Sequence, residues 1–358
     1  MDLRFHWSMS SAGDSYRGAK DRSRMQWLPD FDGLVAFCRH AEECGIESLL
    51  TAVGFHRPDP IALASALGML TTRIKFMVAV RSGLISPTAC VQQVNTVAAL
   101  TNGRICLNVV AGHTPAEQAA YGDFLGHDER YARTDEFLTI CNALWRGDAP
   151  VTFQGKHFHV ENAKLNLGFT DPARKGPEIF IGGASAQAAQ LAIRHGHCLW
   201  TVPEKTETLR EHIAPVLDAG VEAGLLVSMR VRPTREEAVQ SAYAMVEALG
   251  AKAAETHANF ERRSDSVAWR STYDLARNES HWITDTLWSG AVPYMGAPAI
   301  ALVGSPNDVA AAILDYKAMG ISQFLFLGWP DYEEITVFTR DVLPLVRQKE
   351  AAARGSVA

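Results

Sequence analysis

The sequence predicts a single (β/α)8 barrel interrupted by two insertions. Short apolar segments alternate with segments of helical periodicity along almost the whole chain. The apolar segments are continuous runs and do not alternate with polar residues, which is typical of parallel strands covered on both faces. Eight such segments can be identified, and that number favours a closed barrel over the alternative, a doubly wound open sheet. We therefore treat residues 1–358 as one domain, since barrels of this length are common.

The elements follow each other in regular order. The strands are expected at residues 3–7, 48–51, 74–80, 105–110, 179–181, 198–201, 225–231 and 323–327. Helices are expected at 31–44, 60–69 and 87–100, and after the last four strands at 185–195, 204–220, 234–250 and 331–347. Gly45 ends the first helix, and Asn102-Gly103 form the turn before the fourth strand, because both residue types favour turns and helix ends.

Two stretches break this alternation. Residues 151–165 include VTFQGKHFHV, whose alternating pattern around Gln154-Gly155 predicts a small hairpin. Residues 251–299 start as a helix and continue with many Gly, Pro, Trp and Tyr residues. Long insertions of this kind often act as mobile lids, and a lid is our prediction. The alternative is an excursion that packs on the barrel or on a partner subunit.

The composition excludes several classes of function. The net charge is −6, and the basic residues are scattered, which argues against nucleic-acid binding. No run approaches the roughly 18 apolar residues of a membrane helix, and the first residues do not form a signal peptide. The six cysteines lack any CxxC spacing, which indicates reduced, buried thiols and a cytoplasmic location.

Two segments together predict a phosphate-binding site. Residues 108–137 contain NVVAGH and HDERYARTDEF, the end of a buried strand followed by a loop and a helix with Tyr131. Residues 178–192 contain a short apolar strand, a Gly182-Gly183 turn and a helix start at Ser185. Small residues at a helix N-terminus expose backbone N–H groups that bind phosphate. The hydroxyl groups of Ser185 and Tyr131 add donors, so we interpret the two segments as a flavin-phosphate site.

The chain resembles the bacterial-luciferase-like flavin monooxygenases, and within them the alkanesulfonate monooxygenase branch. The resemblance rests on the order and spacing of HWSMSSAGD, SPTACVQQVNTVAALTNGR, NVVAGH, FLGHDERY, GKHFHVENAKL, IGGASAQAAQLA, RSDSVAWR and ALVGSPNDVAAAI. It implies a barrel with an insertion lid, FMN as the cofactor in its reduced form FMNH2, and a separate NAD(P)H:flavin reductase that supplies it. It also implies that an oxygen atom from O2 enters a small-molecule substrate through a flavin-peroxide adduct. We expect a homodimer or homotetramer.

The resemblance also assigns cofactor residues. Carried over position by position, FMN is held by Asn108, Tyr131, Gly183, Ala184 and Ser185. Ala79, at the end of the third strand, is expected under the isoalloxazine ring, and His113 and Glu117 are weaker candidates on the loop after the fourth strand.

The chain departs from its sulfonate-oxidising relatives where those relatives carry polar pocket residues. The positions concerned hold Ala12, Arg57, Val202, Ser228, Met295, Trp329 and Asp331 in this chain. A sulfonate needs hydrogen-bond donors and positive charge, and Met295 and Asp331 provide neither. Arg230 or Arg232 is the candidate for a shifted guanidinium. We interpret the reaction class as kept and the substrate as changed, with Met295 and Asp331 as substrate-binding residues.

Catalytic candidates lie at the carboxyl ends of two predicted strands, where barrel enzymes place their chemistry. His56 and Arg57 follow the second strand, as a proton donor and an anion clamp. The alternative is a plain loop in which Asp59 caps the next helix. Trp329 follows the last strand and is expected to wall the pocket. The alternative for Asp331 is an N-cap that forms a capping box with Glu334.

Three functions remain open from the sequence. They are an FMNH2-dependent monooxygenase, a deazaflavin (F420)-dependent oxidoreductase of the same fold, and a flavin-binding protein without catalysis. We expect no metal, because His157 and His159 on the hairpin lack a third ligand nearby. The substrate and the exact oxygenation reaction are not determined by the sequence.

Overall fold

The computed structural model describes residues 2–9, 30–54 and 57–355, and its centre is a closed parallel barrel. The barrel strands are β1 (Arg4–Ser8), β2 (Ser48–Thr51), β3 (Lys75–Val80), β4 (Ile105–Val110), β7 (Ile179–Gly182), β8 (Cys198–Thr201), β9 (Glu222–Val231) and β12 (Ile321–Gly328). Each pairs in parallel with its neighbours, and β9 closes the circle by pairing with both β8 and β12. The predicted barrel with eight strands is therefore confirmed, and the open-sheet alternative is wrong.

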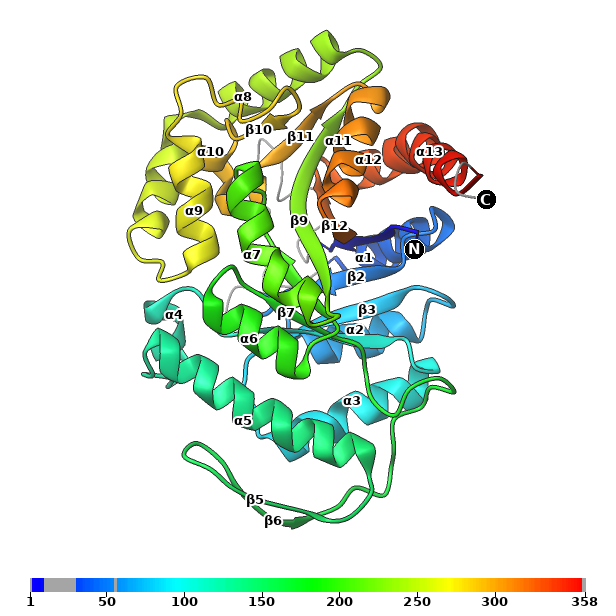
Figure 1. Ribbon diagram of the computed structural model, residues 1–358, viewed down its shortest axis with the longest axis vertical. Helices are drawn as coiled ribbons and strands as arrows, with labels where there is room; N and C mark the ends of the chain where they lie inside the picture. Colours follow the sequence, from blue (N-terminus) through cyan, green and yellow to red (C-terminus); the bar gives the residue numbers. More distant parts are fainter. Residues whose placement is uncertain (1, 10–29, 55–56, 356–358) are drawn as a thin grey trace.

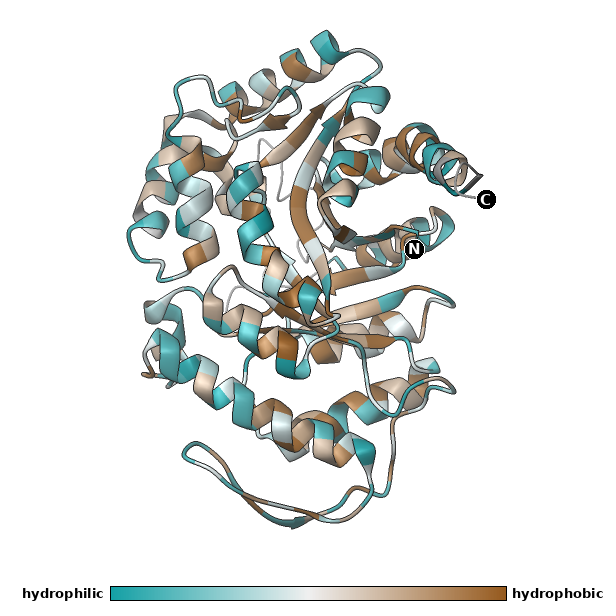
Figure 2. Ribbon diagram, in the orientation of Figure 1, coloured by the Kyte–Doolittle hydropathy of each residue, from teal (hydrophilic) through white to brown (hydrophobic). Residues whose placement is uncertain are grey.

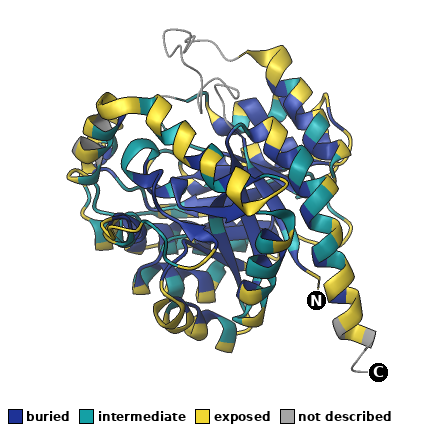
Figure 3. Cartoon of the chain, turned by 90° about the horizontal axis from the view of Figure 1, so that it is seen from above, coloured by how far each residue is buried: buried dark blue, intermediate teal, exposed yellow. Residues whose placement is uncertain are grey.

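Helices surround the strands on the outside (Figure 1). They are α1 (Phe31–Glu43), α2 (Pro60–Gly68), α3 (Pro87–Thr101), α4 (Pro115–Ala120), α5 (His127–Arg146), α6 (Ala186–His195), α7 (Thr206–Asp218), α11 (Pro306–Ala318), α12 (Asp331–Val337) and α13 (Leu343–Gly355). A short π-helix, Phe338–Val342, joins the last two. Seen from above, the strands are buried and the outer faces of the helices are exposed (Figure 3).

The elements that follow the second insertion were not anticipated. Strand β11 (Ala301–Gly304) and helix α11 follow the second insertion. The edge of β9 that faces away from β12 pairs with β8 through Glu222–Leu225 and with β11 through Ser228–Val231. Because β9 is ten residues long, its amino half pairs with β8 and closes the barrel, while its carboxyl half is free to pair with β11.

The two insertions have defined structures. Strands β5 (Val151–Gln154) and β6 (His159–Ala163) form an antiparallel hairpin beneath α5 (Figure 1). The second insertion consists of the end of α8 (Arg235–Glu261), α9 (Val267–Ala276), β10 (Leu287–Trp288), α10 (Val292–Met295) and the turn Ala297–Ala299. These elements gather at one end of the molecule beside β11 (Figure 1). Among the described helices, none is long and apolar enough to span a bilayer.

The barrel strands are mainly hydrophobic (Figure 2), and their side chains form an apolar interior. Its central cluster consists of Leu50, Met77, Ala79, Cys106, Phe180, Cys198, Trp200 and Leu325. Below it lies His6, whose ring nitrogens contact Ser48 Oγ at 2.7 Å and Gln323 Oε1 at 2.9 Å. Burial lowers the pKa of His6 to about 4, so this imidazole is neutral at neutral pH.

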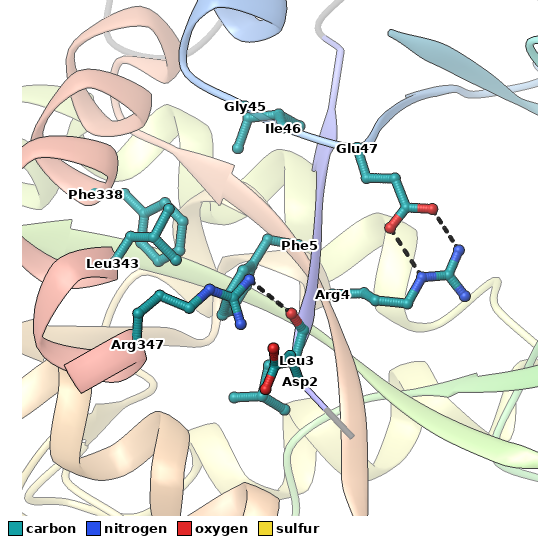
Figure 4. Close-up of a pocket in the computed structure, with 10 residues that line it drawn as sticks. All are labelled: Asp2, Leu3, Arg4, Phe5, Gly45, Ile46, Glu47, Phe338, Leu343 and Arg347. Atoms are coloured by element: carbon teal, nitrogen blue, oxygen red, sulfur yellow. Dashed lines mark hydrogen bonds and ion pairs between the residues drawn. The ribbon is translucent and has the colours of Figure 1, made fainter. Parts of the chain in front are cut away.

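The amino ends of the strands are held by ion pairs. Arg4 bridges Glu47 at 2.5 Å and Glu178 at 2.7 Å. A hollow of about 210 Å³ lies beside this network, and Arg347 reaches across it to the carbonyl oxygen of Leu3 (Figure 4). The charged groups in this hollow are all in ion pairs, Arg4 with Glu47, Arg347 with Glu350 and Asp2 with Arg354. In (β/α)8 barrels this end serves stability rather than chemistry. The candidate site is therefore sought at the opposite end.

Candidate functional site

The turn between β7 and α6 presents backbone N–H groups at the carboxyl end of the barrel. Ser185 is the N-cap of α6, and its hydroxyl accepts a hydrogen bond from the backbone N–H of Ala188 at 3.2 Å. The N–H of Gly183 is bound to the carbonyl oxygen of Trp200 at 3.0 Å, which fixes the path of the turn. The residues around Ala184 are small and place no bulky side chain of their own over the start of the helix. This geometry suits an anionic group at the helix start.

Tyr131 reaches the same turn from α5. A Cβ atom on Gly183 would lie only 2.8 Å from Tyr131 Oη, so the glycine makes room for the phenol. The hydroxyl group of Ser185 lies close enough to that of Tyr131 to favour its ionised form, although burial outweighs this effect. Burial raises the pKa of Tyr131, so the phenol stays protonated and remains a donor. Two segments more than fifty residues apart in the sequence are thus brought together, as the sequence analysis expected of a phosphate site.

Asn108 faces the barrel interior beside this turn. Its Oδ1 atom is buried and has no hydrogen-bond partner among the described residues. A Cβ atom on Gly182 would lie 3.5 Å from this oxygen, which places Asn108 directly next to the β7–α6 turn. On the other side, Asn108 is in register with Ala79 of β3. An unpaired buried amide oxygen is costly, and a ligand donor is a physical reason for it.

Helix α9 of the insertion covers this corner. Its Ala268 and Trp269 pack against Ala184 and Val202. The Trp269 ring stacks on His113 with centroids 4.5 Å apart. Burial lowers the pKa of His113 to about 4, so the stacked imidazole is neutral.

An ion pair ties the insertion to α5. Arg130, next to Tyr131 in the chain, binds Asp265 Oδ2 at 2.6 Å. The remaining nitrogens of Arg130 donate to the carbonyl oxygens of Ala111 and Leu125. The segment before α9 is also bound to the loop after β4, because Ser264 and Asp265 both donate to the carbonyl oxygen of His113. The insertion is therefore docked on the same helix that carries the phosphate-site tyrosine.

Trp329 and Met295 lie in one apolar cluster at the carboxyl end of β12. Trp329 is buried against Trp288, Ala291 and Ala299 of the insertion, and Met295 packs on this cluster. Trp288 is fully enclosed, in edge contact with the ring of Tyr243 on α8. These contacts join the insertion to the barrel mouth.

Asp331 has a different place from the capping box that the sequence suggested. The N-cap of α12 is Pro330, and Asp331 lies in its first turn. The carboxylate of Asp331 accepts hydrogen bonds from Trp7 Nε1 at 2.9 Å and from the backbone N–H of Gly328 at 2.7 Å. The capping box is therefore wrong, because the aspartate turns back toward β1. A direct contact between Asp331 and a substrate stays a prediction.

Arg230, near the end of β9, and Arg232, just after it, also bind other groups. Glu334 is fully buried and binds Arg232 at 2.8 Å and Arg230 at 3.5 Å. Arg230 also donates to Ser241 on α8. Neither guanidinium is therefore available as the shifted anion clamp considered from the sequence.

The loop after β2 carries Arg57, while His56 lies outside the described residues. Asp59 caps α2, as the plain-loop alternative expected, by accepting a hydrogen bond from Ala62 at 2.8 Å. The backbone N–H of Arg57 binds the carbonyl oxygen of Gly54. Glu117 of α4 comes within 3.2 Å of the position that a Cβ atom on Gly54 would occupy. The loop thus meets α4 at the barrel mouth.

One buried charged residue at this mouth was missed. Arg81 follows β3 and forms an ion pair with Glu117 at 3.1 Å. Its position two residues after Ala79 was the available signal, because alternate residues of a strand share one face. Among the described residues, no group of three potential ligands could hold a metal ion.

Comparison with known proteins agrees with this architecture. Residues 3–323 match the family model described as luciferase-like monooxygenase. The chain belongs to the luciferase-like monooxygenase family. Family membership makes the protein an enzyme of the flavin-dependent monooxygenase class.

Solved structures share the fold at low sequence identity. A long-chain alkane monooxygenase (LadA) superposes with a TM-score of 0.77 at 20% identity, over 98% of this chain and 92% of that one. The EDTA monooxygenase (EmoA) from Chelativorans sp. BNC1 gives 0.74 at 20% identity, over 98% and 94%. An F420-dependent secondary alcohol dehydrogenase gives 0.67 at 19% identity, over 97% and 99%. Since these identities are low, the likeness supports the fold and leaves the cofactor and substrate open.

Proposed function

We propose that this member of the family is the oxygenase component of a two-component system, which uses FMNH2 to insert one oxygen atom from O2 into a small organic substrate. The observation that carries the proposal is the corner formed by Tyr131, Gly183 and Ser185 with the unpaired oxygen of Asn108 beside it. The helix start and two hydroxyl groups fit a phosphate. Asn108 and Ala79 then face the part of the barrel where the isoalloxazine ring belongs.

The chemistry is divided between cofactor and protein. Reduced FMN, when bound, supplies the electrons that activate O2. The protein's own residues bind the phosphate, orient the ring against Ala79 and exclude water. Docking of α9 over Ala184 through Trp269 serves the last task. Such a site needs few charged groups, which agrees with the apolar barrel interior.

The substrate is proposed to be neutral or amine-bearing rather than an alkanesulfonate. A buried sulfonate without a cationic partner costs several kcal/mol. At the carboxyl end of the barrel, the guanidinium groups of Arg230 and Arg232 are both engaged by Glu334. Met295 is apolar and packs in the cluster around Trp329. The pocket therefore offers an anion little compensation for its lost hydration.

The test combines binding and turnover. We expect the purified protein to bind photoreduced FMN more tightly than oxidised FMN in anaerobic titrations, and not to oxidise NAD(P)H by itself. With a flavin reductase added, ketones, sulfones and amines should be turned over in air and simple alkanesulfonates should not. Rapid NADPH oxidation by the protein alone with FMN would contradict the two-component proposal. Tight binding of F420 without binding of FMN would favour the deazaflavin alternative.

A further inference from the structure

The ion pair between Arg81 and Glu117 lies at the barrel mouth and is nearly free of solvent. The side chains are 3% and 11% exposed, respectively. Arg81 Nη1 binds Glu117 Oε1, and Arg81 Nη2 donates to the carbonyl oxygen of Val53 at 3.4 Å. A buried guanidinium is tolerated only when it is paired and hydrogen-bonded. These contacts account for two of its three nitrogens.

The third nitrogen, Nε, has no hydrogen-bond partner in the part of the chain that the structure describes. Arg81 Nε is buried and makes no hydrogen bond to any described residue. An unsatisfied buried donor costs about 1–3 kcal/mol, so Nε calls for an acceptor, and none of the described residues supplies one.

Arg81 lies beside the part of the barrel interior that the proposed FMN site would occupy. Arg81 comes two residues after Ala79, whose side chain belongs to the interior cluster of the barrel. Val53, which accepts from Arg81, packs on the same cluster. Strand β4, which carries Asn108, lies between β3 and β7, and β7 ends at the turn proposed to bind the phosphate. Two strand spacings separate β3 from β7 by roughly 10 Å. A ligand whose phosphate lies at the corner therefore brings its distal group toward Arg81.

We propose that Arg81 binds the pyrimidine half of the isoalloxazine ring and favours its reduced form. This inference rests on the proposed FMN function. The pyrimidine half carries carbonyl oxygens and, after reduction, a negative charge shared by N1 and the adjacent carbonyl group. A fixed cation with a free N–H next to that charge stabilises it. Glu117 is the positioning residue, because its carboxylate holds the guanidinium of Arg81 in place. Gly54, which has no side chain, leaves space for the carboxylate of Glu117.

The experiment compares the dissociation constants of oxidised FMN and photoreduced FMN, measured anaerobically, together with the midpoint potential of the bound flavin. In Arg81→Met, the affinity for reduced FMN should fall at least tenfold more than that for oxidised FMN. A tenfold selective loss moves the potential of a two-electron couple about 30 mV more negative. Arg81→Lys keeps the charge but not Nε, and it should recover part of this shift.

Two further variants separate electrostatics from structure. Glu117→Gln removes the compensating charge and should move the potential in the positive direction. Arg133→Met is the matched control, because Arg133 of α5 forms a similar buried pair with Asp123, at 2.5 Å. We expect that variant to lose stability without changing the ratio of the two dissociation constants.

The outcomes are distinguishable. A wild-type protein that binds neither form of FMN refutes the proposed function. If the wild type binds FMN but Arg81→Met weakens both forms equally, Arg81 is only structural and the inference fails. A negative shift for both Arg81→Met and Glu117→Gln also overturns it. Opposite shifts in these two variants support it.

Discussion

The ion pair that docks the insertion gives a prediction whose size follows from the structure. Arg130 is 1% exposed and its partner Asp265 is 26% exposed, with 2.6 Å between Nη2 and Oδ2. Removing one partner of a fully buried pair costs about 3–5 kcal/mol. Asp265 keeps some contact with water, and asparagine still offers an acceptor. We therefore expect Asp265→Asn to destabilise the docked insertion by about 2 kcal/mol.

This loss is local, so it should be measured locally. Hydrogen exchange of the amides in α9 should become roughly 30-fold faster, since each 1.36 kcal/mol corresponds to a factor of ten. The control is Asp274→Asn on the same helix, whose pair with Arg277 is mostly exposed. Exposed pairs contribute less than about 1 kcal/mol, so exchange should change little. Equal exchange rates in the two variants would show that the pair with Arg130 does not hold the insertion.

Three further predictions follow from individual contacts. Tyr131→Phe and Ser185→Ala should each weaken FMNH2 binding by about 1–2 kcal/mol in fluorescence titrations, and an unchanged double variant would refute the phosphate site. Glu136 accepts three backbone hydrogen bonds from residues 156–158, so Glu136→Ala should expose the hairpin to limited proteolysis with a local loss of about 2 kcal/mol. The pKa of His6 is lowered from 6.5 to about 4, so the unfolded chain takes up a proton in this window and the folded one does not. Stability should fall by about 2 kcal/mol from pH 7 to pH 5 in urea unfolding at fixed protein concentration, and His6→Gln should flatten that decline.

Much of the fold was readable because each barrel strand is a short apolar run. A strand enclosed by helices on one side and by the barrel interior on the other has no solvated face, and this leaves a continuous signal in the sequence. Strand β11 was missed because it follows an irregular insertion and pairs with the carboxyl half of β9 and with the two-residue strand β10. Its identity as a strand depends on a partner whose length was not evident from the pattern.

The residues of the candidate site were also predictable only in part. Ser185 and Tyr131 were identifiable from a helix start and from the resemblance, and the structure brings them together. The role of Asp331 at the turn was misjudged because a local capping pattern competes with the distant donor Trp7. Arg81 carries no local motif at all.

The sequence by itself determined the barrel, the order of its strands and the small residues of the phosphate corner, because hydrophobic periodicity and helix starts are encoded within a few neighbouring residues. Only the tertiary structure decided which charges are available at the barrel mouth. Glu334 forms ion pairs with Arg230 and Arg232, and Glu117 forms one with Arg81. These partners are far apart in the sequence, so no spacing rule predicts the pairs. The physical reason is that a buried charge is stabilised by whichever opposite charge the fold brings within about 4 Å, and that choice depends on packing.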